Sequence, residues 1–187
     1  MGFSHYVPNN KPHVMKMILK YIIGAVLLAT GSWLTLHTFK SYQTKKEIGN
    51  RIQTLQHCCF ESLTGGQTYI DEFNPDQPTI IMYFHPECEH CQYESGEIGK
   101  EKEQFEKVNM ILITPDDSTV RVEDFAKRFR LWDVDNLTIL MDRKNRFKSH
   151  FGTTVIPSLF IYGSDKKLIK MYKGEIRMKA VIRAVKI

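Results

Sequence analysis

Acidic residues are scarce at the beginning of this chain. Residues 1–51 contain seven Lys or Arg and a single acid, Glu47, whereas the rest of the chain holds 19 basic and 20 acidic residues. The formal net charge of +5 therefore belongs to the N-terminal segment. No basic face with interleaved aromatics argues for nucleic-acid binding. No internal repeat or low-complexity tract is present either, which excludes a repeat architecture.

Charged residues are absent altogether from Tyr21 to Phe39, and Lys20 and Lys40 bracket this stretch. At about 1.5 Å per residue a helix of this length spans roughly 28 Å, close to the thickness of a bilayer's hydrocarbon core. We therefore expect a basic segment over residues 1–20, a single transmembrane helix over 21–39 and a polar stalk over 40–56.

A cleaved signal peptide is the rival interpretation of the same stretch. Its apolar region would run from Tyr21 to Ala29, with a weak small-residue cleavage site just after it. The apolar pattern continues through Trp33, Leu34 and Leu36, which favours a retained anchor. A buried core helix fits poorly, because the stretch is apolar on all sides.

Cysteine is also scarce, with four residues in the chain. Cys88 and Cys91 form a Cys-x-x-Cys pair, and the other two, Cys58 and Cys59, are adjacent. A four-thiolate zinc site usually needs a second Cys-x-x-Cys pair. Neighbours on a strand point to opposite faces, so the adjacent pair is a poor chelator. We expect one of the adjacent cysteines in the core and the other exposed, both structural, and no bound metal. A third redox thiol or a metal contact with His57 is the alternative for this pair.

The dithiol directly follows an apolar run, Thr79–Phe84, that is typical of a buried strand, and a helical pattern follows it. A helix N-terminus presents unpaired N–H groups and partial positive charge, which stabilise a thiolate. The thiolate is the species that attacks a disulfide, and the second cysteine then displaces the partner. This pattern predicts redox chemistry that uses the chain's own thiols and needs no cofactor.

Strands and helices alternate through the rest of the chain. A short hairpin is expected around Thr64–Gln67, and Asn74–Pro78 breaks the chain before the first buried strand. Further elements follow this strand: a helix over 88–108, a strand over 110–114, a helix over 120–129, a strand over 137–141, a short helix over 145–151, a hairpin of 158–162 with 167–172, and a helix over 177–185. This order predicts an α/β fold with a mixed sheet flanked by helices, in a domain spanning 57–187.

Three segments together resemble the thioredoxin fold: the strand ending in Cys88-Glu-His-Cys91, the segment Thr154-Val-Ile-Pro157, and the hairpin that begins at Gly163. More narrowly, the chain resembles the membrane-anchored, TlpA-like thiol-disulfide oxidoreductases. These proteins carry an N-terminal anchor, an extra N-terminal hairpin and a Cys-x-x-Cys-x-x-Glu site, which here is Cys88, Cys91 and Glu94.

The resemblance implies a role for each site residue. Cys88 would be the nucleophile, Cys91 the resolving cysteine and Glu94 the proton acceptor for the resolving thiol. Pro157 would be a cis-proline packed against the dithiol and, with Ile156, would bind substrate. Ile156 in this position is the thioredoxin-like choice, which favours reduction of protein disulfides over their formation.

The residues around Cys88 depart from the family pattern. Glu87 stands where many members have tryptophan, and Glu87 and Glu89 both place negative charge beside the proposed nucleophile. His90 would oppose them as an imidazolium, whereas a neutral His90 is only a polar helix residue. We therefore expect Glu89 and His90 to tune the dithiol. We expect His85 and His150 to lie at the surface or at the edge of the core.

Location and partners follow from the chemistry. The Lys and Arg counts on the two sides of the apolar stretch nearly tie, so they do not orient it. A dithiol on a single-span anchor suits an oxidising compartment. We expect a bacterial inner-membrane protein with its catalytic domain on the periplasmic side. Its partners would be protein disulfides or dithiols and a membrane or extracytoplasmic electron donor.

Two other functions use the same fold. A thiol peroxidase would carry threonine three residues before the reactive cysteine, and this position is His85. A copper-handling module would space its cysteines by three residues and add a distant histidine. Here the spacing is two, and His150 is the available histidine.

Overall fold

The computed structural model describes residues 11–185; half of the basic segment predicted over 1–20 lies outside the described residues. The chain divides into two compact units, one ending at Lys46 and one running from Glu47 onward. The first consists of most of helix α1 (Lys11–Arg51). One helix in the described part of the chain, Met15–Arg51, is long and apolar enough to cross a membrane. No protein covers its most apolar window, which suits a hydrocarbon environment.

The second unit begins before residue 57, the domain boundary that the sequence predicted. Ile52 and Leu55, within the predicted stalk, are buried in the core of this unit. Leu55 N also donates to the carbonyl of Lys166 at 2.8 Å, which ties the segment to the chain near the C-terminal hairpin. The predicted stalk therefore has an apolar C-terminal end that packs as part of the domain.

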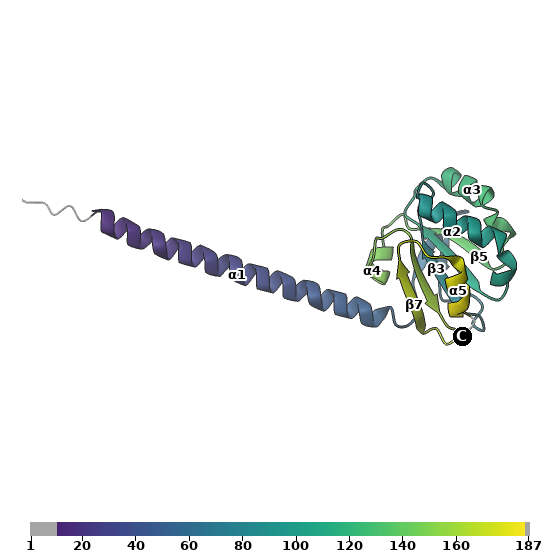
Figure 1. The fold of residues 1–187 in the computed structure, drawn as a ribbon, viewed down its shortest axis with the longest axis horizontal. Coiled ribbons are helices and arrows are strands. Elements are labelled where there is room, and N and C mark those ends of the chain that lie inside the picture. The colour runs from purple at the N-terminus through teal and green to yellow at the C-terminus, as the bar shows by residue number, and fades with distance from the viewer. Residues whose placement is uncertain (1–10, 186–187) are drawn as a thin grey trace, which may run out of the picture. The chain divides into compact units, whose positions relative to one another are not determined.

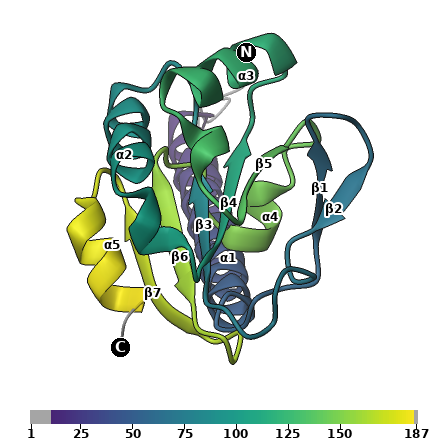
Figure 2. The same ribbon diagram turned by 90° about the vertical axis from the view of Figure 1, so that its right-hand side faces the viewer.

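The described residues contain one seven-stranded mixed sheet, in the order β2-β1-β5-β4-β3-β6-β7 (Figure 2). The strands are β1 (Cys59–Ser62), β2 (Gln67–Tyr69), β3 (Thr79–Tyr83), β4 (Asn109–Thr114), β5 (Leu137–Met141), β6 (Ser158–Tyr162) and β7 (Leu168–Lys173). The three strands β3, β4 and β5 are parallel, and all other pairs are antiparallel. This arrangement confirms the predicted mixed sheet and the N-terminal hairpin.

Alternate residues of β3 pack into two hydrophobic cores on opposite faces of the sheet, as the period of a strand requires. The first core holds Met82 and is covered by α2 (Glu89–Lys100), α3 (Thr119–Arg128) and α5 (Met178–Val185). The second holds Ile81 and is covered by α4 (Phe147–Phe151). Helices α2 and α5 lie side by side (Figure 1). The strand that leads into the dithiol is therefore buried on both faces.

Helix α2 is shorter than the predicted helix over 88–108. It ends at Lys100, and a separate 3-10 turn, η1 (Lys102–Phe105), follows it. Phe105 and Val108 are buried in the first core. The prediction of one continuous helix was wrong, because the chain must turn after Lys100 to bring these side chains back to the sheet.

Helix α2 packs very closely against the segment that follows α3. A Cβ atom placed on Gly99 would lie 2.0 Å from the carbonyl oxygen of Phe129, whereas one placed on Gly96 would lie 3.6 Å from the Phe129 ring. The first distance is a clash with backbone, and the second is an ordinary contact. Glycine at position 99 thus permits the close contact between α2, the helix that carries the dithiol, and the backbone of Phe129.

We predict that Gly99→Ala destabilises the folded unit by about 1–3 kcal/mol, because the methyl group must displace backbone in a packed region. Gly96→Ala is the matched control on the same helix, and we expect it to be neutral or stabilising by up to about 1 kcal/mol, since alanine is the better helix former. Thermal or urea unfolding of the two variants measures the difference. Equal stabilities would contradict the close packing described for Gly99.

Candidate active site

Cys88 lies at the N-cap position of α2, immediately after the turn that follows β3. Its backbone is extended (φ −80°, ψ 117°), and its Sγ accepts a hydrogen bond from the backbone N–H of Cys91 at 3.3 Å. The Cys88 N–H donates to the carbonyl of His85 at 3.0 Å. The side chain is partly exposed. The sulfur therefore sits where the free N–H groups of the helix converge, accessible to a partner.

Cys91 is fully buried, one helical turn into α2, and both cysteines are free thiols in this structure. Burial is the main reason that the pKa of the Cys91 thiol lies well above its ordinary value. Its hydrogen bond with Cys88 raises this pKa further, and a hydrogen bond with the backbone of His85 opposes the shift. The pair thus combines one accessible sulfur with one buried, protonated thiol.

Glu94 is fully buried, one turn after Cys91 on the same helix. Its Oε1 accepts a hydrogen bond from the backbone N–H of Ile176 at 2.7 Å, and its Oε2 has no hydrogen-bond partner among the described residues. Burial raises the pKa of this carboxyl from 4.5 to about 7, against the hydrogen bond from Ile176. A buried carboxyl that titrates near neutral pH, close to a buried thiol, is suited to proton transfer.

His90 and Glu89 occupy the exposed first turn of α2. His90 Nδ1 pairs with Glu175, in the loop between β7 and α5. The partner that the structure gives His90 is therefore a carboxylate from a distant part of the chain. Glu89 places its charge at the N-terminus of α2, where a carboxylate interacts favourably with the helix dipole.

The Ile156–Pro157 peptide bond is cis, the isomer that the resemblance implied. Ser158, the next residue, begins β6 and pairs in register with Tyr83 at the end of β3. Pro157 therefore lies beside the end of the strand that leads into the dithiol. Its carbonyl accepts a hydrogen bond from Gly174 N at 2.9 Å, and Ile156 packs against both cores.

Residues 53–171, more than half of the chain and including both cysteines, match the model of the AhpC/TSA family. The chain belongs to the AhpC/TSA family. Its fold is thioredoxin-like, with a mixed sheet flanked by helices. Glu175 and Ile176, which hold His90 and Glu94, lie beyond the matched residues.

A curated relative of this AhpC/TSA member is the thiol-disulfide oxidoreductase ResA of Bacillus cereus (strain ATCC 10987 / NRS 248). The two are 19% identical over 162 residues, which is 86% of this chain and 89% of the relative. Two solved structures share the fold. One is a secreted Mycobacterium tuberculosis disulfide oxidoreductase homologous to E. coli DsbE (TM-score 0.60, 15% identity, 73% of this chain and 97% of that chain). The other is StoA from Bacillus subtilis (TM-score 0.55, 18% identity, 71% and 98%).

Both adjacent cysteines are buried in this family member, although we expected one to be exposed. Cys58 lies in the second core, and burial raises the pKa of its thiol to about 12. Cys59, at the start of β1, is covered as well, and its thiol contacts Gln67 Oε1 at 3.4 Å. The prediction failed for Cys59 because Gln67, across the hairpin, and Arg146, whose Nη2 lies 3.8 Å from the sulfur, both contact its thiol.

No group of three or more His, Cys, Asp or Glu side chains gathers to hold a metal ion in the described part of the chain. His150, the histidine considered for copper, packs edge-on against Phe60 in the second core. Cys91 lies in the first core. The sheet therefore separates this histidine from the resolving cysteine, which argues against their sharing an ion.

Four residues near the dithiol have roles that the sequence did not indicate. Glu175 and Ile176 contact α2 from the loop after β7. Asp116 and Arg121, from the β4–α3 region, contact the turn before Cys88. Ser118, as an N-cap residue, signals in the sequence that a helix starts there. No local pattern shows which side chain of this helix reaches the turn before Cys88.

We predict a pH-dependent stability caused by Glu94. Its folded-state pKa is raised from 4.5 to about 7, so the folded state holds the proton more tightly and loses stability as the pH rises between these values. A shift of this size corresponds to a loss of at most about 3 kcal/mol. Glu94→Gln should remove most of it, in urea unfolding at pH 4.5 and pH 8.

Glu97→Gln, on the same helix but partly exposed and paired with Lys100, is the control for this measurement. It should leave the pH dependence of the wild-type chain unchanged. A Glu94→Gln variant that loses stability with pH as steeply as the wild type would contradict the assignment.

Proposed function

We propose that this chain is a membrane-tethered thiol-disulfide oxidoreductase that reduces disulfides in proteins. The observation that carries the proposal is the asymmetry of the dithiol. Cys88 is accessible at a helix N-terminus, and Cys91 is buried behind it with a hydrogen bond between the two residues. The curated relative, a thiol-disulfide oxidoreductase, supports this assignment.

The reaction begins when the Cys88 thiolate attacks one sulfur of a substrate disulfide. A mixed disulfide forms between Cys88 and the substrate, and the other substrate sulfur leaves as a thiolate that takes up a proton. The Cys91 thiol then loses its proton and attacks Cys88 Sγ, which expels the second substrate sulfur. The substrate has gained two electrons, and Cys88 and Cys91 are joined by a disulfide.

Glu94 supplies the base for the second half of this reaction. Cys91 is held protonated by burial, so its attack requires a proton acceptor within the protein. Glu94 Oε2 is buried without a hydrogen-bond partner among the described residues, and the carboxyl titrates near pH 7. A carboxylate with this pKa accepts a proton at neutral pH and releases it again during the cycle.

Substrate docks, in this proposal, over the Ile156–Pro157 segment. The pairing of Ser158 with Tyr83 places this segment beside the end of β3. Val155, directly before it, is exposed. Ile156 is half-buried and Pro157 is buried, so in this proposal an extended polypeptide that presents a disulfide meets the segment at Val155 and Ile156.

The anchor and its side of the membrane complete the proposal. Helix α1 is long and apolar enough to hold the catalytic unit at a membrane. A reductase of protein disulfides meets its substrates where disulfides form, which is outside the cytosol. We place the catalytic unit on the periplasmic side of a bacterial inner membrane. A membrane or extracytoplasmic donor must then return two electrons to the Cys88–Cys91 disulfide after each turnover.

We predict that Cys91→Ala accumulates mixed disulfides in cells, because Cys88 still attacks substrate but nothing resolves the product. Acid quenching, alkylation and non-reducing electrophoresis of the full chain measure them. The wild-type pair should be mostly reduced, and Cys88→Ala should trap nothing. Cys59→Ala, which alters a thiol away from the dithiol, is the control and should behave as wild type.

Two outcomes would overturn this function. One is a Cys88–Cys91 pair that never changes its redox state in cells. The other is copper binding at micromolar affinity or tighter by a chain that has no disulfide reductase activity. Peroxide consumption by the purified chain, without reduction of protein disulfides, would instead favour the thiol peroxidase.

We also predict that Glu94→Gln slows resolution of the mixed disulfide by about a hundredfold at pH 7, the scale of general base catalysis. The rate at which Cys88 is alkylated should stay within about twofold of the wild-type rate, because the first attack does not use Glu94. Rapid-mixing kinetics with a disulfide-bonded peptide separates the two steps. Glu97→Gln is again the control, and equal loss in both steps would contradict the assigned role.

A further inference from the structure

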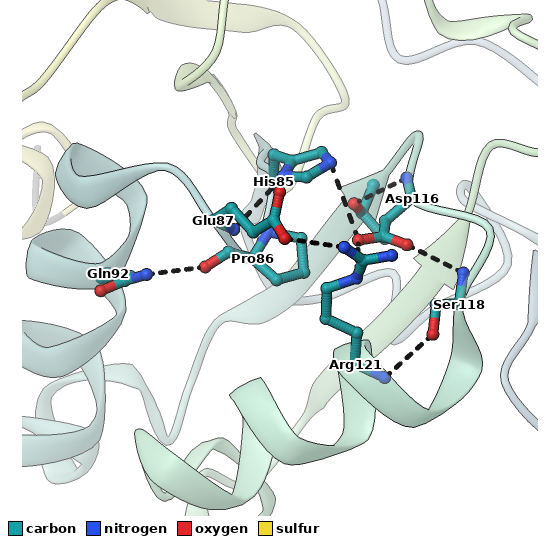
Figure 3. Close-up of polar contacts among 8 residues, drawn as sticks. His85, Pro86, Glu87, Gln92, Asp116, Ser118 and Arg121 are labelled. Atoms are coloured by element: carbon teal, nitrogen blue, oxygen red, sulfur yellow. Dashed lines mark hydrogen bonds and ion pairs between the residues drawn. The ribbon is translucent and has the colours of Figure 1, made fainter.

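A polar network lies against the turn before Cys88, away from Glu94. Figure 3 shows its members converging from three segments: His85 and Glu87 before α2, Asp116 and Ser118 after β4, and Arg121 in the first turns of α3. The mechanism above uses none of these residues. Two of them, Glu87 and Asp116, are acids, and Arg121 contacts both.

Arg121 bridges the two acids with separate nitrogens of its guanidinium group. Its Nη1 donates to Glu87 Oε1 at 2.7 Å, and its Nε lies 3.0 Å from Asp116 Oδ2. A planar guanidinium presents several donors in fixed directions, which allows one side chain to contact both carboxylates. Arg121 therefore joins the residue before the nucleophile to the loop that starts α3.

Asp116 holds Arg121 in this position. Its side chain is only 2% exposed, and its Oδ1 accepts a hydrogen bond from Ser118 N at 2.8 Å. Its Oδ2 makes no hydrogen bond of good geometry among the described residues, so its link to Arg121 is an ion pair. A buried carboxylate of this kind needs a counter-charge, which Arg121 supplies.

The turn itself is held by hydrogen bonds that do not involve Arg121. Glu87 N donates to His85 Nδ1 at 3.2 Å, and His85 Nε2 lies 3.7 Å from Asp116 Oδ2. Gln92 Nε2 donates to the carbonyl of Pro86 at 2.9 Å. Loss of the arginine charge therefore leaves these constraints on the Cys88 backbone in place.

We propose that Arg121 is a positioning residue for the nucleophile: by pairing with Glu87 it removes the negative charge that this neighbour would exert on the Cys88 thiolate. This inference deepens the proposed function and rests on it. Glu87 directly precedes the nucleophile in the chain, and its carboxylate alone would oppose thiolate formation at Cys88. Arg121 allows this chain to carry an acid next to its attacking sulfur.

The test measures how fast iodoacetamide alkylates Cys88 in the full chain in detergent, at pH 7 and low salt, with the modified peptide quantified by mass spectrometry. Arg121→Ala should slow alkylation by about threefold to fivefold, because the Glu87 charge that it leaves unpaired is mostly exposed to solvent. Arg121→Lys keeps the charge and should stay within about twofold of wild type. Arg130→Ala, which breaks an exposed ion pair with Asp133 instead, is the control.

A double variant separates the effect of the charge from the effect of packing. Glu87→Gln combined with Arg121→Ala should recover most of the lost rate, and 1 M salt should shrink the deficit of Arg121→Ala, because screening weakens the interaction of exposed charges. Unchanged alkylation in Arg121→Ala would overturn the proposal. A deficit that neither Glu87→Gln nor salt repairs would overturn it as well, since Arg121 would then act through packing or through the buried Asp116 and not through Glu87.

This test does not depend on the proposed function. Iodoacetamide needs no protein substrate, so the alkylation rates report on Arg121 even in a chain that reduces no disulfide. If the chain reduces no disulfide but Arg121→Ala slows the alkylation of Cys88 as expected, only the proposed function is contradicted. If the chain reduces disulfides but Arg121→Ala leaves the alkylation rate of Cys88 unchanged, only this inference is contradicted.

Discussion

The constraint on which the site depends is the burial of β3 on both faces of the sheet. Its alternating side chains enter two separate cores, and it pairs with β4 on one side and β6 on the other. A strand held in this way has no freedom to shift its register, because a slip of one residue would exchange the two faces. The dithiol follows this strand after one short turn, so its place at the carboxyl end of the parallel strands is fixed.

The two cysteines acquire different chemistry from this single attachment. Cys88 caps α2 and stays accessible, while Cys91 points into the first core one turn later. Burial that makes Cys91 a poor thiolate also makes Glu94 a good base, since it raises the pKa of both groups. The same low-polarity environment thus holds the proton on the thiol and provides the carboxyl that can take it.

Two acids near the start of α2 have side-chain partners from other segments of the chain. Glu87 meets Arg121 from α3, and Glu175 meets His90 from α2. These contacts link the start of α2 to helix α3 and to the loop between β7 and α5. Charges that look unfavourable along the chain become part of networks once the loops come together, and the geometry of the dithiol turn is held by hydrogen bonds besides them.

Much of this protein was determined by local sequence. The uncharged stretch from Tyr21, the alternation of strands and helices, and the Cys88–Cys91 spacing predicted the anchor, the mixed sheet and the dithiol, because hydrophobic periodicity and helix-start chemistry act over a few residues. Only the tertiary structure decided the end of α2, the burial of Cys59 and the partners of Glu94 and Glu87. The end of α2 depends on the return of Phe105 and Val108 to the sheet, and Arg146, Ile176 and Arg121 reach Cys59, Glu94 and Glu87 from other segments. Such contacts arise from packing over long sequence distances, where no local pattern records which side chains will meet.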